Sequence, residues 1–240
     1  MILRTSVTNI GGAFKFPDIG RTGGSSDGTE WTLGEMMVIR GTMTDQVRQN
    51  AEGYLAHKWG LVSNLPLDHP WANIGPYEDT RTGIDLTLYW GSSDGGTDTG
   101  AWENTVSFGK KTPKLAIWLD ADDASSFSLS GSNVTSWNNK AGASYNFDQK
   151  SSDPSRVTSG NGKSVVNFDG DDQLWTNDGF TKPNYTILSV ARYTGGLNKR
   201  VIGSKNINWL FGFWNNGTDK FHFNSWLHGG SKTYDAGWHL

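Results

Sequence analysis

Short runs of apolar residues, many of them alternating with polar ones, recur along the chain between segments rich in glycine, serine and asparagine. Such alternation places successive side chains on opposite faces of an extended strand. The pattern predicts strands over residues 14–19, 30–39, 84–90, 115–119, 134–137, 165–168, 185–193, 200–202, 209–214 and 221–226. We therefore expect an all-β protein, with an antiparallel sandwich of about seven or more strands after residue 114.

One segment, residues 44–59, has helical rather than alternating spacing of its apolar residues. Thr44 is a typical N-cap, and Gly60 is typical of the residue that ends a helix in a left-handed conformation. We expect a single α-helix near residues 44–59. The residues expected to pack it against the sandwich are Tyr54, Leu55 and Trp59.

The chain divides into three parts by its strand pattern. Residues 72–113 contain one well-patterned strand, followed by a glycine-rich and threonine-rich stretch. So few strands are too little to bury an independent core. We therefore expect a connector or domain fragment at residues 72–113, between a first part at residues 1–71 and a third part at residues 114–240.

Composition and charge exclude several classes of function. The 31 glycines and a charged fraction of only 19% suit short strands joined by many turns. A net charge of −3 gives no broad positive field, so we expect neither a nucleic-acid partner nor an anionic membrane surface. The chain has no cysteine, which excludes disulfides and thiol chemistry. It also lacks an apolar run long enough to insert into a membrane and a recognisable signal peptide at its start.

The richest aromatic segment, residues 209–226, is predicted to form a β-hairpin around an Asn-Gly turn. Alternation places Trp209, Phe211 and Phe213 on one face of the first strand, and Leu210 and Trp214 on the other. Both faces therefore carry bulky apolar groups, and one of them is expected to fill the core.

The second face of this hairpin gives the candidate ligand site. A tryptophan ring beside amide and carboxylate groups is the combination that binds sugar hydroxyls and sugar faces. The candidate ligand-binding residues are Trp214, Asn215, Asn216 and Asp219. The alternative is that Trp214 is simply buried beneath a loop or beneath further strands.

Two groups of aspartates follow predicted strands. One group is Asp120, Asp122 and Asp123, and the other is Asp169, Asp171 and Asp172. Aspartate at such positions commonly caps turns through its own side chain. Several carboxylate oxygens in one loop also suit Ca²⁺. We keep turn capping as one interpretation and name Asp169, Asp171 and Asp172 as the candidate metal ligands, with Ca²⁺ as the ion.

Several strings resemble the laminin-G-like domains of the concanavalin A-like lectin superfamily in bacterial and phage surface proteins. Residues 51–61 and 65–70 are similar to the segment that closes such a domain, and residues 116–123, 134–142 and 165–172 are similar to the segments that open one. Residues 86–97, with Trp102, resemble part of a fibronectin-III-like spacer. The resemblance implies a jelly-roll sandwich, permuted and incomplete, in the order of closing part, spacer and opening part. It also implies a calcium site on the rim of the sandwich.

The same superfamily contains glycoside hydrolases, which need two carboxyl groups across the scissile bond. The glutamates stand isolated at residues 30, 35, 52, 78 and 103, so no strand offers a row of acidic side chains. We therefore expect no enzymatic activity. The function implied by the resemblance is a carbohydrate-binding or adhesive module, extracellular or on a cell or virion surface, with a glycan or neighbouring repeats of the same protein as partners. A structural spacer without a ligand is the alternative, and a fragment of a glycoside hydrolase is the third possibility.

Overall fold

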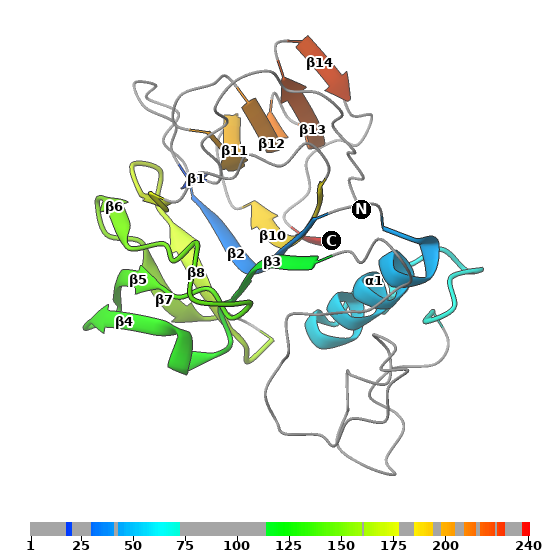
Figure 1. Ribbon diagram of the computed structural model, residues 1–240, viewed down its shortest axis with the longest axis horizontal. Coiled ribbons are helices and arrows are strands. Elements are labelled where there is room, and N and C mark those ends of the chain that lie inside the picture. The colour runs from blue at the N-terminus through cyan, green and yellow to red at the C-terminus, as the bar shows by residue number, and fades with distance from the viewer. Residues whose placement is uncertain are drawn as a thin grey trace.

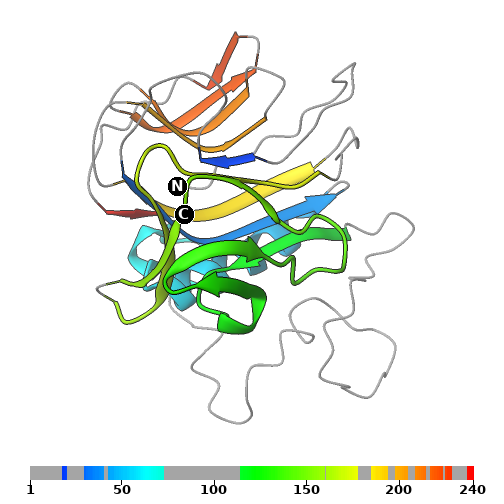
Figure 2. The ribbon, with the colours of Figure 1, turned by 90° about the vertical axis from the view of Figure 1, so that its left-hand side faces the viewer.

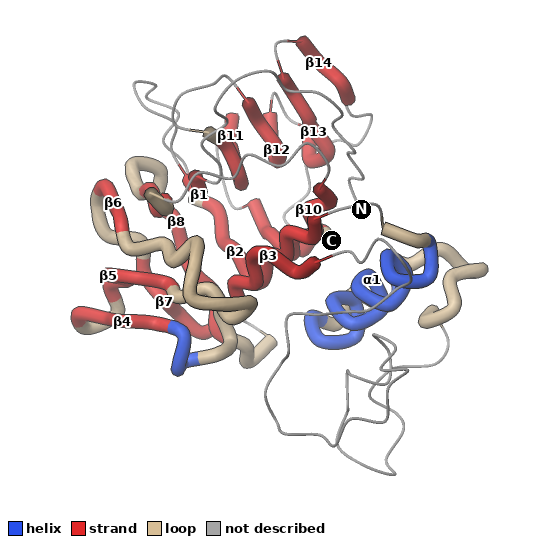
Figure 3. The backbone as a smooth tube through the Cα atoms, in the orientation of Figure 1, coloured by secondary structure: helices blue, strands red, loops and turns tan. Residues whose placement is uncertain are grey.

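Two β-sheets pack face to face in the computed structural model, and one helix covers the outer side of one sheet (Figure 1). Figure 3 shows how strongly strands dominate the architecture. The structure describes residues 18–20, 30–40, 43–72, 114–159, 161–177, 185–193, 198–204, 209–214, 217–223, 225–228 and 237–240.

The first sheet has seven strands among the described residues, and every pairing in it is antiparallel. Its spatial order is β14 (Ser225–His228), β13 (Gly217–Phe223), β12 (Trp209–Trp214), β11 (Asn198–Gly203), β1 (Asp18–Gly20), β9 (Gln173–Trp175) and β6 (Gln149–Ser151).

The second sheet has eight strands in the described part of the chain, also paired antiparallel. Its main path is β15 (Trp238–His239), β10 (Tyr185–Tyr193), β2 (Trp31–Arg40), β8 (Ser164–Phe168), β7 (Ser155–Thr158), β5 (Asn133–Trp137) and β4 (Phe127–Ser130), and β3 (Lys114–Asp120) pairs with β2 beside β8.

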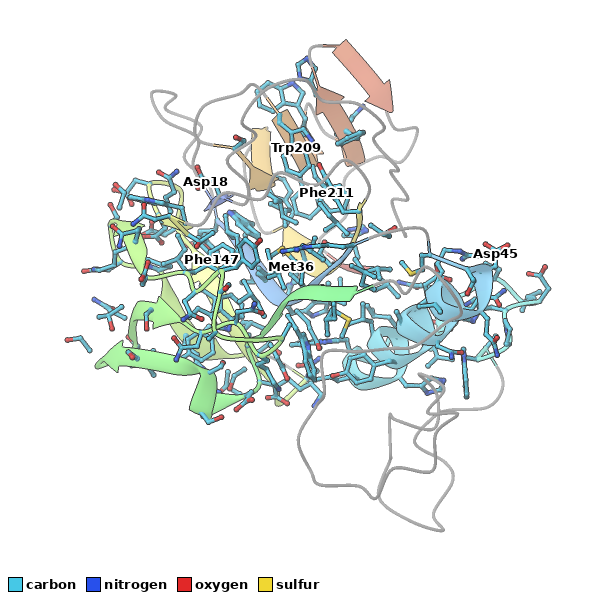
Figure 4. The ribbon with its side chains drawn as sticks, viewed as in Figure 1. Asp18, Met36, Asp45, Phe147, Trp209 and Phe211 are labelled. Carbon is cyan, nitrogen blue, oxygen red and sulfur yellow. The ribbon has the colours of Figure 1, made fainter. Side chains whose placement is uncertain are left out.

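The core lies between the two sheets and is built from the alternating inward side chains of both. One buried cluster contains Trp209 and Phe211 of β12, Met36 of β2, and Phe147 (Figure 4). All four side chains are buried. The predicted antiparallel β-sandwich is therefore confirmed, whereas the jelly-roll connectivity remains a prediction.

The helix α1 (Asp45–Trp59) forms where its spacing predicted it. The Thr44 side chain accepts a hydrogen bond from the backbone N–H of Val47 at 3.3 Å, and Gly60 ends the helix with a φ of 72°. Two short 3-10 turns complete the helical content of the described residues, η1 (Val62–Asn64) and η2 (Ala124–Ser126). In Figure 2 the layers follow one another as the first sheet, the second sheet and α1 in cyan.

The strand expected over residues 221–226 is wrong as a single element. The structure divides it between β13 and β14, which pair with each other through Phe223 and Ser225. The chain therefore reverses direction inside the range that alternation treats as continuous. The strand expected at residues 84–90 lies outside the described residues, as does all of 73–113.

The segments before and after the connector share both sheets. β1 lies between β11 and β9, and β2 lies between β10 on one side and β3 with β8 on the other. Every described strand partner of β1 and β2 therefore comes from residues 114–240. For the described residues, the first and third parts of the chain therefore close into one sandwich.

A β-bulge in β2 turns Glu35 towards the helix. Val190 pairs with Glu35 and Ala191 with Leu33, so Gly34 is the extra residue in the ladder. A Cβ at Gly34 would lie 2.7 Å from the Trp59 ring. Only glycine therefore lets α1 approach the strand this closely.

The Glu35 carboxylate is fully buried and receives donors from two directions. Tyr54 Oη at 3.0 Å and Trp59 Nε1 at 2.9 Å donate from α1, and Trp118 Nε1 donates from β3 at 2.7 Å. The ammonium of Lys58 lies 2.9 Å from the same carboxylate. A buried carboxylate is tolerated only when it is paired and hydrogen-bonded in this way.

We expect Trp59→Ala to lower the free energy of unfolding by about 3–5 kcal/mol, because it removes a large buried ring and one donor to Glu35. Denaturant unfolding followed by circular dichroism measures this. Leu67→Ala is the matched control, since Leu67 is 93% exposed and should change stability by less than about 0.5 kcal/mol. A similar, small effect for both variants would contradict the packing of α1 described above.

Candidate functional site

The outer face of the first sheet carries a row of side chains that crosses its strands. Residues directly opposite each other in a ladder point to the same face, and the chain neighbours Phe221, Ile202, Ile19 and Leu174 all lie in the core. The row therefore points outward. In spatial order it consists of His222, Leu210, Gly203, Asp18, Trp175 and Gln149.

A carboxylate and an amide form the polar centre of this row. Gln173 Nε2 donates to Asp18 Oδ2, and both side chains are buried, with Asp18 only 2% exposed. Next to them, Gly20 has a φ of 103°, and a Cβ there would overlap the carbonyl oxygen of Asp172. The close approach of β1 to the turn before β9 therefore fixes the polar centre beside the Asp172 backbone.

Two tryptophans lie on the same face of the sheet as this centre. Trp175 of β9 and Trp214 of β12 are both half-buried. Trp214 points outward because Phe213 beside it is buried in the core. The alternation predicted for this strand is therefore confirmed, and so is the hairpin, since β12 pairs with β13 from Trp209 to Trp214.

The structure tests only part of the predicted ligand site. Trp214 lies at the end of β12, on the outer face of the sheet. Asn215 and Asn216 lie outside the described residues, and for Asp219 only the backbone, within β13, is described. Lys220 and His222 of β13 are half-buried on the same outer face as Leu210, and the hairpin analysis did not single them out.

Sequence patterns missed Asp18, Gln173 and Trp175 as parts of one face. They belong to β1 and β9, which are three residues long each. Alternation over so short a length is no signal. The one available hint was a lone aspartate before an apolar residue and a glycine at residues 18–20.

The turn between β8 and β9 brings the predicted metal ligands together. Asp169, Asp171 and Asp172 each offer a carboxylate oxygen, and these oxygens all lie within 4.8 Å of one another. Asp172 is 3% exposed and its Oδ2 accepts a hydrogen bond from the backbone N–H of Asp169 at 2.9 Å. The hydrogen bond is a turn cap, and the converging oxygens also suit a divalent cation.

Burial raises the pKa of Asp172 to about 6, and the neighbouring carboxylates of Asp169 and Asp171 add to the shift. Within the described residues no lysine or arginine forms an ion pair with these three aspartates. Protonation or a bound cation would therefore relieve their mutual repulsion.

The other aspartate group differs because lysines compensate its charge. Asp120 contacts Lys58 at 2.7 Å and Lys140 at 2.9 Å, and Asp122 contacts Lys163 at 3.0 Å. Asp123 accepts from the backbone N–H of Ser125 at 3.0 Å, which caps η2. This group is therefore a set of turn caps and ion pairs, as the capping interpretation predicted.

The comparisons with known proteins identify no relative: no family model, curated protein or solved structure matches this chain. The resemblance to laminin-G-like domains therefore remains a prediction from the sequence. No helix in the described part of the chain is long and apolar enough to cross a membrane.

We expect Asp172→Asn to stabilise the metal-free protein more at about pH 7 than at about pH 4. The carboxyl titrates near pH 6 in the folded state against a reference pKa of 3.8, so its contribution to stability is lost as the pH rises between these values. Asparagine keeps an acceptor for the Asp169 N–H but carries no charge. Melting temperatures in EDTA at the two pH values measure the effect. If the variant melted higher than the unaltered protein by the same amount at both pH values, the ionised Asp172 carboxylate would not be what destabilises the folded state.

Proposed function

We propose that this protein is a non-catalytic carbohydrate-binding or adhesive module and that the outer face of its first sheet is the glycan site. The observation that carries the proposal is that two half-buried tryptophans, Trp175 and Trp214, lie on the same outer face of the sheet as the buried Asp18–Gln173 hydrogen bond. Tryptophan rings stack on the apolar faces of sugars, while amide and carboxylate groups bind their hydroxyls.

The helix α1 covers part of the outer face of the second sheet. Its outer side chains Met37, Ile39 and Leu188 pack against α1 in one apolar cluster. No described helix covers the outer face of the first sheet. From β9 to β12 it spans three strand spacings, about 14 Å, which suits a chain of sugar rings rather than a single one.

We further propose that Ca²⁺ binds at Asp169, Asp171 and Asp172. The ion would relieve the repulsion of three carboxylates and stiffen the turn whose backbone contacts Gly20 of β1. Because the polar centre of the glycan face lies on β1, a bound ion at this turn would support the face without touching the sugar.

The partners of the buried glutamates support the proposal that the module is non-catalytic. Glu35 is held by four donors beneath α1, and Glu52 is paired with Arg48 and His69. Neither is placed on the proposed glycan face. An extracellular position on a cell or virion surface, next to repeats of the same protein, follows from the sequence resemblance. A structural spacer that displays other modules is the second candidate.

We expect Trp214→Ala and Trp175→Ala each to weaken glycan binding at least tenfold, because each removes a stacking platform. A glycan array identifies the ligand, and titration calorimetry with that glycan measures the change. Leu67→Ala, on the segment after α1, is the control with unchanged binding. Absence of saturable binding to any glycan, with or without calcium, would favour the spacer function.

We expect millimolar CaCl₂ to raise the melting temperature above that in EDTA at neutral pH. Binding to the folded form alone stabilises it by about 2.7 kcal/mol when the free ion is a hundredfold above its dissociation constant. The double variant Asp171→Asn and Asp172→Asn should abolish the rise. Coincident melting curves for the unaltered protein would leave these aspartates as turn caps, and a rise that survives the double substitution would place the ion elsewhere.

A further inference from the structure

Three buried ionisable groups meet where α1 crosses β2 and β3. The Nζ of Lys58 lies 2.7 Å from Oδ1 of Asp120 and 2.9 Å from Oε2 of Glu35. The side chains of Lys58, Asp120 and Glu35 are 9%, 6% and 0% exposed. An amine, a carboxyl group and a second carboxyl group are therefore held together with little access to water.

We propose that Lys58 and Asp120 become joined by a spontaneous amide bond between their side chains, with Glu35 as the group that carries the proton. The bond would tie the last turn of α1 covalently to the end of β3. It would be an internal cross-link in a chain that has no cysteine to form a disulfide.

The reaction balances without any other reactant. Glu35 first takes a proton from the Lys58 ammonium, and the freed amine lone pair attacks Cγ of Asp120. The tetrahedral intermediate then expels Oδ1, which receives the proton held by Glu35 and a second proton from the Lys58 nitrogen and leaves as water. One hydrogen stays on the nitrogen as the amide N–H, and Glu35 returns to its starting carboxylate.

The neighbouring groups match the needs of each step. Lys140 Nζ lies 2.9 Å from Oδ2 of Asp120, where the intermediate carries its negative charge. Tyr54 Oη and Trp118 Nε1 bind the other oxygen of Glu35, so that Oε2 stays directed at Lys58. Because the reacting groups are already positioned in the folded protein, the reaction is unimolecular and does not depend on a collision in solution.

Burial favours the proton transfer that starts the reaction, whereas the attraction between Lys58 and the two carboxylates opposes it. Burial raises the pKa of Glu35, and the nearby Asp120 carboxylate raises it further. Burial lowers the pKa of Lys58, but the carboxylates of Glu35 and Asp120 raise it, and the net shift is upward. The reaction therefore starts from an ion pair, and its low-dielectric surroundings reduce the preference for charged groups over neutral ones.

Intact-mass spectrometry of the purified protein, fully unfolded in acid, tests the proposal. We expect a mass one water molecule below that of the sequence. Trypsin should then release residues 49–81 and residues 115–140 as one branched species, because the modified Lys58 is no longer a cleavage site. A mass equal to that of the sequence, or a loss of water located anywhere else, would overturn the proposal.

Three variants separate the cross-link from a permanent ion pair. Lys58→Arg keeps the positive charge but should show no loss of water, and Asp120→Asn should lose ammonia in place of water. Glu35→Gln, checked for folding by circular dichroism, should leave most of the protein unlinked after a time in which the unaltered protein reacts fully. Complete linkage in Glu35→Gln would remove Glu35 from the reaction, and a loss of water in Lys58→Arg would exclude Lys58 as the amine.

Discussion

The buried carboxylate of Glu35 is the constraint around which the sandwich is organised. It lies in the central strand of the second sheet with no exposure to water, so its charge must be met by protein donors. Those donors come from α1 and from β3, which are separated from each other by the whole connector. Satisfying one side chain therefore requires that α1 and β3 be in place together beside β2.

Strands from the first part of the chain lie between strands from the third part, so the two parts depend on each other throughout both sheets. β1 and β2 each lie between strands that follow residue 114, so neither can be withdrawn without opening a sheet. β1 also carries Asp18, and its Gly20 contacts the turn of Asp172. The proposed glycan face and the proposed calcium turn thus both depend on the closure of the first part of the chain onto the third.

The two aspartate groups differ in their surroundings, and so do the two sheets. Lysines compensate Asp120, Asp122 and Asp123, which fits structural ion pairs and, for Asp120, the proposed cross-link. Asp169, Asp171 and Asp172 have no such compensation among the described residues, which fits a cation. Likewise, α1 covers the outer face of the second sheet, whereas the first sheet keeps half-buried tryptophans on its outer face. Function is therefore proposed at the three clustered aspartates and on the sheet face that carries the half-buried tryptophans.

The sequence by itself determined the elements whose signals are local: the helix with its Thr44 cap and Gly60 end, the long strands, and the placement of Phe213 and Trp214 on opposite faces of β12. It also brought the three aspartates of one turn together, because residues so close in the chain cannot lie far apart. Only the tertiary structure decided which distant groups meet. Glu35 looked like an isolated glutamate, and Trp175 belongs to a strand too short to show alternation. The strand predicted over residues 14–19 contained Asp18 but did not show which strands would lie beside it. Register between strands and the docking of α1 created these sites, and both depend on contacts between residues that no sequence period connects.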